Sequence, residues 1–158
     1  MPRQLADEVR RQYLDPPAPQ SSGIDCVFLT CFNSEFQVFA VLLGYSGIRL
    51  HCAGALEEAD FLLKVTGATV LLSDAAFLDG TWYEAAEMLA DAHPGVEFVV
   101  VLDEAENAFW AATLDRGGWD LALKPLRVGR LREAIRNAHR TATSGAAGAR
   151  LSRRRQVL

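Results

Sequence analysis

Two residues that together could handle a phosphoryl group each stand at the end of a short apolar stretch. Asp74 ends the stretch ATVLLSD, and Lys124 follows DLAL, directly before Pro125. A carboxylate can act as a nucleophile, and an ammonium group can neutralise phosphate oxygens. Pro125 favours an extended backbone at Lys124, which fixes where the lysine points. From the residues alone, the alternative is a structural ion pair between Asp74 and Lys124.

The elements that must position these two residues follow from hydrophobic periodicity. Short apolar runs alternate strictly with helix-like segments. The runs cover residues 26–31, 48–53, 68–74, 96–103 and 120–125, and the helical segments cover 33–47, 55–67, 81–95, 104–118 and 127–140. Strict alternation requires crossover connections, and it predicts a parallel sheet with helices on both faces.

In such sheets, ligands bind beyond the carboxyl ends of the strands. We therefore expect one edge of the sheet to bring together the residues at the strand tips. These are Thr30, Cys31, Ala53, Asp74, Leu102, Asp103 and Lys124. The third helical segment begins with Thr81 and Glu84, which are spaced as a capping box, and the fourth ends on a glycine pair suited to a C-cap.

This ordered set of features resembles the receiver domain of response regulators in two-component signalling. The resemblance covers about residues 24–140 and rests on Asp74, on DRGGWDLALKP and on GIRLHCAGALEEADFLL. It implies an α/β, flavodoxin-like, doubly wound sheet of five parallel strands in the order 2-1-3-4-5. It also implies that Asp74 accepts a phosphoryl group from a histidine kinase and that Lys124 contacts the phosphate.

Several positions depart from the family's pattern. Acids that follow the first strand and help to bind Mg²⁺ are replaced by Thr30 and Cys31, the hydroxyl ending the fourth strand by Leu102, and the aromatic on the fifth by Leu121. The loop AAFLDG after Asp74 is short and lacks Met-Pro. Mg²⁺ prefers several oxygen ligands, so Asp74 as sole carboxylate should hold it weakly. We expect an atypical receiver with weak or lost Mg²⁺-dependent phosphorylation.

Cys31 supports a different hypothesis. It lies between a strand and the start of a helix, where the helix dipole can lower a thiol pKa. The alternatives are therefore a small thiol enzyme that uses Cys31 or a flavodoxin-like cofactor-binding protein. The first lacks the arginine of a cysteine-phosphatase loop, since position 37 is Gln37, and the second would use the stretch TCFNSEF. We expect the three histidines at the surface.

The chain divides into three parts. Residues 1–23 combine a short helix, with Leu5, Val9 and Tyr13 spaced at fours, with a Pro/Ser-rich linker. Residues 24–140 should form the receiver-like domain, and residues 141–158 a basic tail. No second folded domain fits after residue 140. We therefore expect a stand-alone, bacterial type of module that has no DNA-binding output.

Composition narrows the partners and the location. The chain of 158 residues is 50% hydrophobic and 23% charged, which is typical of a globular domain. It has no apolar run of about 20 residues and no signal peptide, so we expect a cytoplasmic protein without membrane contact. Outside the arginines of residues 140–158, the body is acidic and poorly suited to nucleic acid.

The expected partners are a histidine kinase or another signalling protein. Trp110 and Trp119 also suggest a homodimer through the fourth helix, fifth strand and fifth helix, although either could pack in the core. We expect no enzymatic activity beyond self-phosphorylation of Asp74 from a kinase or a small phosphodonor.

Overall fold

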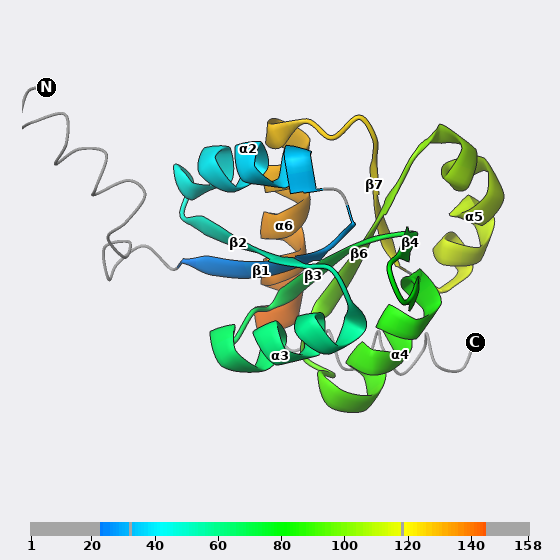
Figure 1. Cartoon of the computed structure of the whole chain (residues 1–158), viewed down its shortest axis with the longest axis horizontal. Coiled ribbons are helices and arrows are strands. Elements are labelled where there is room, and N and C mark those ends of the chain that lie inside the picture. The colour runs from blue at the N-terminus through cyan, green and yellow to red at the C-terminus, as the bar shows by residue number, and fades with distance from the viewer. Residues whose placement is uncertain (1–22, 32, 118, 145–158) are drawn as a thin grey trace, which may run out of the picture.

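The computed structural model describes residues 23–31, 33–117 and 119–144 (Figure 1). Within these ranges, five parallel strands form one sheet in the order β2-β1-β3-β6-β7. The strands are β1 (Ile24–Leu29), β2 (Ile48–Ala53), β3 (Val70–Asp74), β6 (Glu97–Leu102) and β7 (Asp120–Leu123). Along the chain this is the order 2-1-3-4-5, so the predicted fold is confirmed.

The helices that follow the strands cover both faces of the sheet. They are α2 (Asn33–Gly44), α3 (Leu56–Thr66), α4 (Trp82–Ala92), α5 (Glu104–Gly117) and α6 (Val128–Thr143). Buried residues of α3, α4 and α5 belong to one hydrophobic cluster, and those of α2 and α6 belong to another. The predicted N-terminal helix and most of the basic tail lie outside the described residues.

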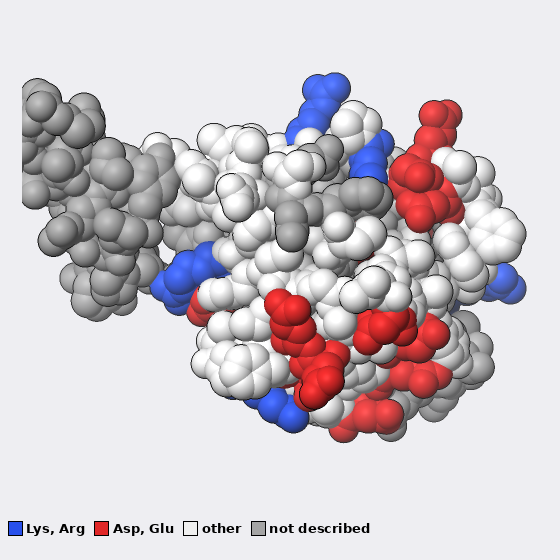
Figure 2. Space-filling view, in the orientation of Figure 1, with Lys and Arg blue, Asp and Glu red and all other residues white. Residues whose placement is uncertain are grey.

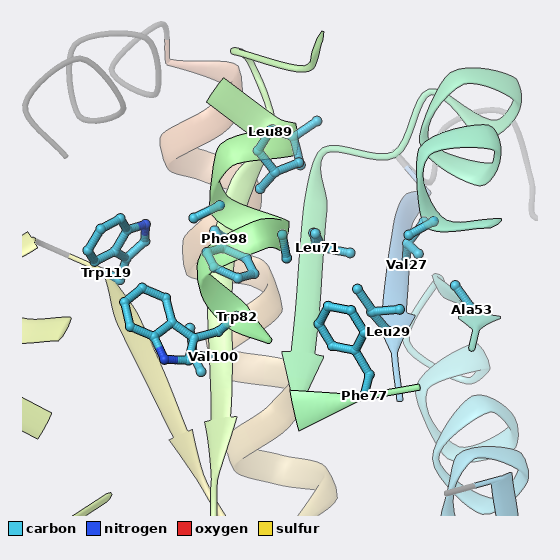
Figure 3. Packing of buried hydrophobic residues seen from close by; sticks show 14 of the residues in the cluster. Val27, Leu29, Ala53, Leu71, Phe77, Trp82, Leu89, Phe98, Val100 and Trp119 are labelled. Atoms are coloured by element: carbon cyan, nitrogen blue, oxygen red, sulfur yellow. The ribbon is translucent and has the colours of Figure 1, made fainter. Parts of the chain in front are cut away.

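The alternation of side chains along β6 explains why both faces are covered. Phe98, Val100 and Leu102 point into the cluster beneath α3, α4 and α5, whereas Val99 and Val101 point into the cluster beneath α6 and α2. All five are fully buried, as successive residues of a central strand must be. Figure 3 shows Phe98 beside Leu71, its partner on the neighbouring strand.

Three tryptophans pack together in the cluster beneath α3, α4 and α5. The Trp82 ring meets Trp110 and Trp119 edge to face, each with ring centroids 5.3 Å apart. Trp119 is only 4% exposed, and Trp110 is partly buried. Of the two uses predicted for these tryptophans, core packing is therefore confirmed for Trp119.

A small hairpin that the sequence did not predict follows the end of β3. It consists of β4 (Ala76–Phe77) and β5 (Gly80–Thr81), which pair antiparallel. Its base is closed by a hydrogen bond from the Trp82 backbone N–H to the Ala75 carbonyl, 2.9 Å long. The Asp79 carboxylate accepts a 3.1 Å hydrogen bond from the Leu56 backbone N–H and so ties the hairpin to α3.

The predicted capping box begins α4 directly after the hairpin. The Thr81 backbone N–H donates to the Glu84 carboxylate at 2.9 Å, and the Thr81 hydroxyl donates to the same carboxylate. These bonds hold the pKa of Glu84 below its usual range. Among the described residues, no helix has the length and apolarity that crossing a bilayer requires.

Candidate functional site

Asp74 lies at the carboxyl edge of the sheet because β3 is a central strand that ends there. β1 and β3 are parallel neighbours with Leu29 opposite Ser73, so the residues that follow, Thr30 and Asp74, also lie side by side. The Thr30 backbone N–H donates to the Ala53 carbonyl at 2.9 Å, which fixes the threonine at the tip of β1. Both side chains are buried, with Thr30 3% and Asp74 4% exposed.

The Thr30 hydroxyl donates a hydrogen bond to Asp74 Oδ2, with an O–O distance of 2.5 Å. Bonds from a hydroxyl to a carboxylate are short and strong because the acceptor is charged. The sequence analysis predicted that Thr30 lies at this edge, but only as a residue that replaces an acid of the receiver family. Its direct contact with Asp74 was not predicted.

Lys124 reaches the other oxygen of the same carboxylate. Its Nζ lies 3.3 Å from Asp74 Oδ1, so the predicted pair does come together. The Lys124 backbone N–H donates to the Leu102 carbonyl at 2.8 Å, and the Lys124–Pro125 peptide bond is cis. Within the described part of the chain, Asp74 Oδ1 accepts no hydrogen bond, so the ammonium group is the charge that faces it.

These contacts give the two carboxylate oxygens different surroundings. Oδ2 is engaged by a neutral donor, and Oδ1 faces a cation whose side chain is 29% exposed. A buried carboxylate needs such partners, because burial without them costs several kcal/mol. The arrangement is therefore a complete resting ion pair that also links β1, β3 and the end of β7.

The donor set does not suit a Mg²⁺ ion. Mg²⁺ is bound by oxygen lone pairs in near-octahedral geometry. Here the nearest groups to Asp74 are a hydroxyl that already donates to it and a positively charged ammonium. The second acid position holds Cys31, which is exposed. No group of three or more metal-ligating His, Cys, Asp or Glu side chains occurs among the described residues.

The remaining strand tips supply apolar or already engaged side chains. Leu102 is fully buried and Ala53 is buried, so neither offers a polar group at the edge. Asp103 caps α5: its carboxylate accepts from the Glu106 backbone N–H at 2.7 Å, and the Glu106 carboxylate accepts from the Asp103 N–H at 2.9 Å. This cap was not predicted, although an Asp followed three residues later by a Glu is a sequence signal for it.

The cysteines differ in their surroundings. Cys31 is exposed, whereas Cys26 is fully buried, and burial raises the pKa of the Cys26 thiol far above its usual range. Burial and the nearby Glu58 raise the pKa of the Cys52 thiol as well. Residue 32, in the loop on which both alternative hypotheses rest, lies outside the described residues.

The three histidines, which were expected at the surface, are of intermediate exposure, and each contacts a polar side chain. His51 Nε2 lies 2.9 Å from Asp25 Oδ1, and His93 Nε2 lies 2.6 Å from Asp60 Oδ1. His139 Nδ1 lies 2.7 Å from the Thr69 hydroxyl oxygen. Each ring is at least partly buried, and each joins elements that are distant in sequence.

The sequence matches no family model and no curated protein. Its structure, however, is similar to many solved chains. One is a response regulator receiver domain protein from Clostridium thermocellum, which has a TM-score of 0.66 and 14% identity over 77% of this chain and 98% of that one. Another, the beryllofluoride-activated NtrC4 receiver domain dimer, has a TM-score of 0.66 and 18% identity over 75% and 98%.

A third solved chain carries a different name. It is described as an adenylate cyclase from Rhodopirellula baltica and has a TM-score of 0.69 at 11% identity, covering 82% of this chain and 97% of that one. At such low identities, structural likeness speaks for the fold. The strand order, the layers and these neighbours agree, and the chain has the fold of a response-regulator receiver domain.

Proposed function

We propose that this chain is a receiver-like module of phosphorelay signalling that acts through protein–protein contacts, with phosphoryl transfer to Asp74 weak or lost. One observation carries the proposal. The hydroxyl of Thr30 occupies Asp74 Oδ2 at the position where the family has an acid, while Lys124 faces Oδ1. Compared with the receiver family, the chain retains the aspartate and the lysine at Asp74 and Lys124. It lacks the neighbouring acids that would bind a cation.

Phosphorylation would require an Asp74 oxygen to attack the phosphorus atom of a phosphohistidine or a small phosphodonor. Negative charge is spread over the three equatorial oxygens of the phosphoryl group in the transition state. Lys124 offers one positive charge against it, and buried Leu102 offers no hydroxyl. With Asp74 only 4% exposed, the phosphodonor must also displace contacts that stabilise the resting pair.

The expected partners are a histidine kinase or another signalling protein. The surface formed by α5, β7 and α6 is the candidate for self-association, because Phe109 on α5 is 74% exposed and Leu123 on β7 is 53% exposed. The structurally similar NtrC4 receiver domain supports the proposed self-association, because its solved structure is described as a dimer.

The direct test is incubation with acetyl phosphate and Mg²⁺, followed by intact mass measurement. The wild-type chain should gain a phosphoryl group on a small fraction of molecules or on none, and its NMR spectrum should change little with beryllofluoride. Asp74→Asn is the control for modification elsewhere. A stoichiometric adduct that appears in the wild type and disappears in Asp74→Asn would show that efficient phosphorylation is retained, and the proposal would then be wrong.

A restoring variant tests the physical reason for the loss. Thr30→Asp with Cys31→Asp places two carboxylates beside Asp74 and removes the hydroxyl from Oδ2. We expect this variant to bind Mg²⁺ and to gain a phosphoryl group on Asp74. Thr30→Asn with Cys31→Asn matches the size without the charge and should gain neither. If the acidic variant folds but stays unmodified, the missing acids are not the cause.

A further inference from the structure

Helix α2 carries an apolar stripe on each of two faces. Phe39 and Leu43 are buried against the sheet, as expected for the inner face. A second stripe, formed by Val38, Val41, Leu42 and the adjoining Tyr45, is 57%, 42%, 38% and 56% exposed. Its spacing of three, four and seven residues is that of a helix face that packs against another element. We call these residues the outer stripe of α2.

Charge is almost absent from this helix. Glu35 is the one charged residue in the sequence of α2. In Figure 2, uncharged surface extends over the region of α2, whereas acidic side chains gather over α3 and α4. A surface helix that is apolar on both sides is expected to be covered. An exposed apolar stripe of this kind therefore indicates a docking site.

The N-terminal segment joins the folded body beside the outer stripe. β1 begins at Ile24, whose backbone N–H donates to the Gly47 carbonyl at 2.9 Å. Gly47 follows the carboxyl end of α2 by three residues, so β1 begins at that end of the helix (Figure 1). Residues 1–22 precede β1 in the sequence, so their point of attachment is near this end of α2.

Residues 1–14 match the outer stripe of α2 in apolar spacing and in helical length. Met1, Leu5, Val9 and Tyr13 recur at fours and would share one face of a helix, with Arg3 and Arg10 on the other. Fourteen helical residues would be about 21 Å long, and α2 about 18 Å. The linker of residues 15–22 spans up to about 25 Å as an extended proline-rich chain, which permits either direction of docking.

We propose that residues 1–14 form an amphipathic helix that docks on the outer stripe of α2 in the same chain. The tether favours this occupant over a second copy. A short linker holds the segment at an effective concentration in the millimolar range, so even a weak contact is populated. A second copy would have to compete with it at micromolar concentrations. This proposal does not depend on whether Asp74 is phosphorylated.

The test is hydrogen exchange of backbone amides in the full chain. We expect amides within residues 3–14 to exchange at least about tenfold more slowly than in an unstructured peptide, a difference that corresponds to a populated docked state. Leu5→Asp with Val9→Asp should abolish this protection. Val38→Gln with Val41→Gln, on the exposed face of α2, should abolish it equally without changing the far-UV circular dichroism of the body.

The matched control is Gln4→Asp with Arg11→Gln, which changes the charge by the same amount on the polar face and should keep the protection. Free exchange of residues 3–14 in the wild type would overturn the proposal. So would protection that survives the α2 substitutions. Protection that rises with protein concentration, together with a dimer in sedimentation, would assign the outer stripe to a second copy instead.

Discussion

At the scale of the residue, the hydrogen bond from Thr30 to Asp74 predicts that this contact stabilises the fold. Thr30→Val keeps the shape but leaves Asp74 Oδ2 without its donor. Because an unsatisfied buried acceptor carries the full cost of its desolvation, we expect a loss of about 1–3 kcal/mol in unfolding free energy. Urea denaturation at neutral pH measures it. The same change in an Asp74→Asn background should cost less, and equal costs would show that the two side chains are not coupled.

A second residue-scale prediction concerns Asp25 on β1. Arg49 on the edge strand β2 donates to both Asp25 oxygens at 2.8 Å, and His51 lies within bonding distance. The hydrogen bond from Arg49, aided by His51, holds the pKa of Asp25 below its ordinary value of 3.8. The unfolded chain therefore binds the proton more readily than the folded one.

The stabilisation from Asp25 is thus fully present above pH 3.8 and is lost as the pH falls through the lower folded pKa. Thermal unfolding of the wild type and of Asp25→Asn, followed against pH, measures this. We expect the wild type to have the higher Tm near neutrality and the difference to shrink below pH 3.8. A difference that is constant across the acid range would contradict the role of this carboxylate.

At the scale of the element, the junction between α5 and β7 depends on close packing rather than on backbone freedom. A Cβ at Gly117 would lie 1.9 Å from the buried ring of Trp119. Gly117→Ala should therefore destabilise the fold by about 1–3 kcal/mol, since the indole cannot move aside. Gly129→Ala in α6 meets no atom within 4 Å and should be neutral or stabilising by at most about 1 kcal/mol. Chemical denaturation of both compares them directly.

The elements differ in how far the sequence predicted them. The five strands of the main sheet and the helices between them were predictable because apolar runs and helical periodicity reflect burial directly. The hairpin of β4 and β5 was missed because strands of two residues have no measurable period. The Thr30–Asp74 contact depends on the register of β1 against β3, which side-chain types do not encode locally.

At the scale of the whole molecule, one sheet supports two hydrophobic clusters, one on each face. The residues from Phe98 to Leu102 on β6 belong alternately to one cluster and the other, so the same backbone connects both. The tryptophans Trp82, Trp110 and Trp119 all lie on the side of α4 and α5, and their fluorescence reports that side alone. Far-UV circular dichroism reports the helices of both sides. The two signals can therefore test whether the layers unfold together.

We predict that they do. Val99→Ala opens space in the cluster beneath α2 and α6, and Val100→Ala does so on the tryptophan side. Each should cost about 1–3 kcal/mol, because both side chains are fully buried. With cooperative unfolding, each variant shifts the fluorescence and dichroism midpoints by the same amount. A Val99→Ala variant whose dichroism midpoint falls while its tryptophan midpoint stays would mean that the two layers unfold independently, because the sheet would then fail to couple them.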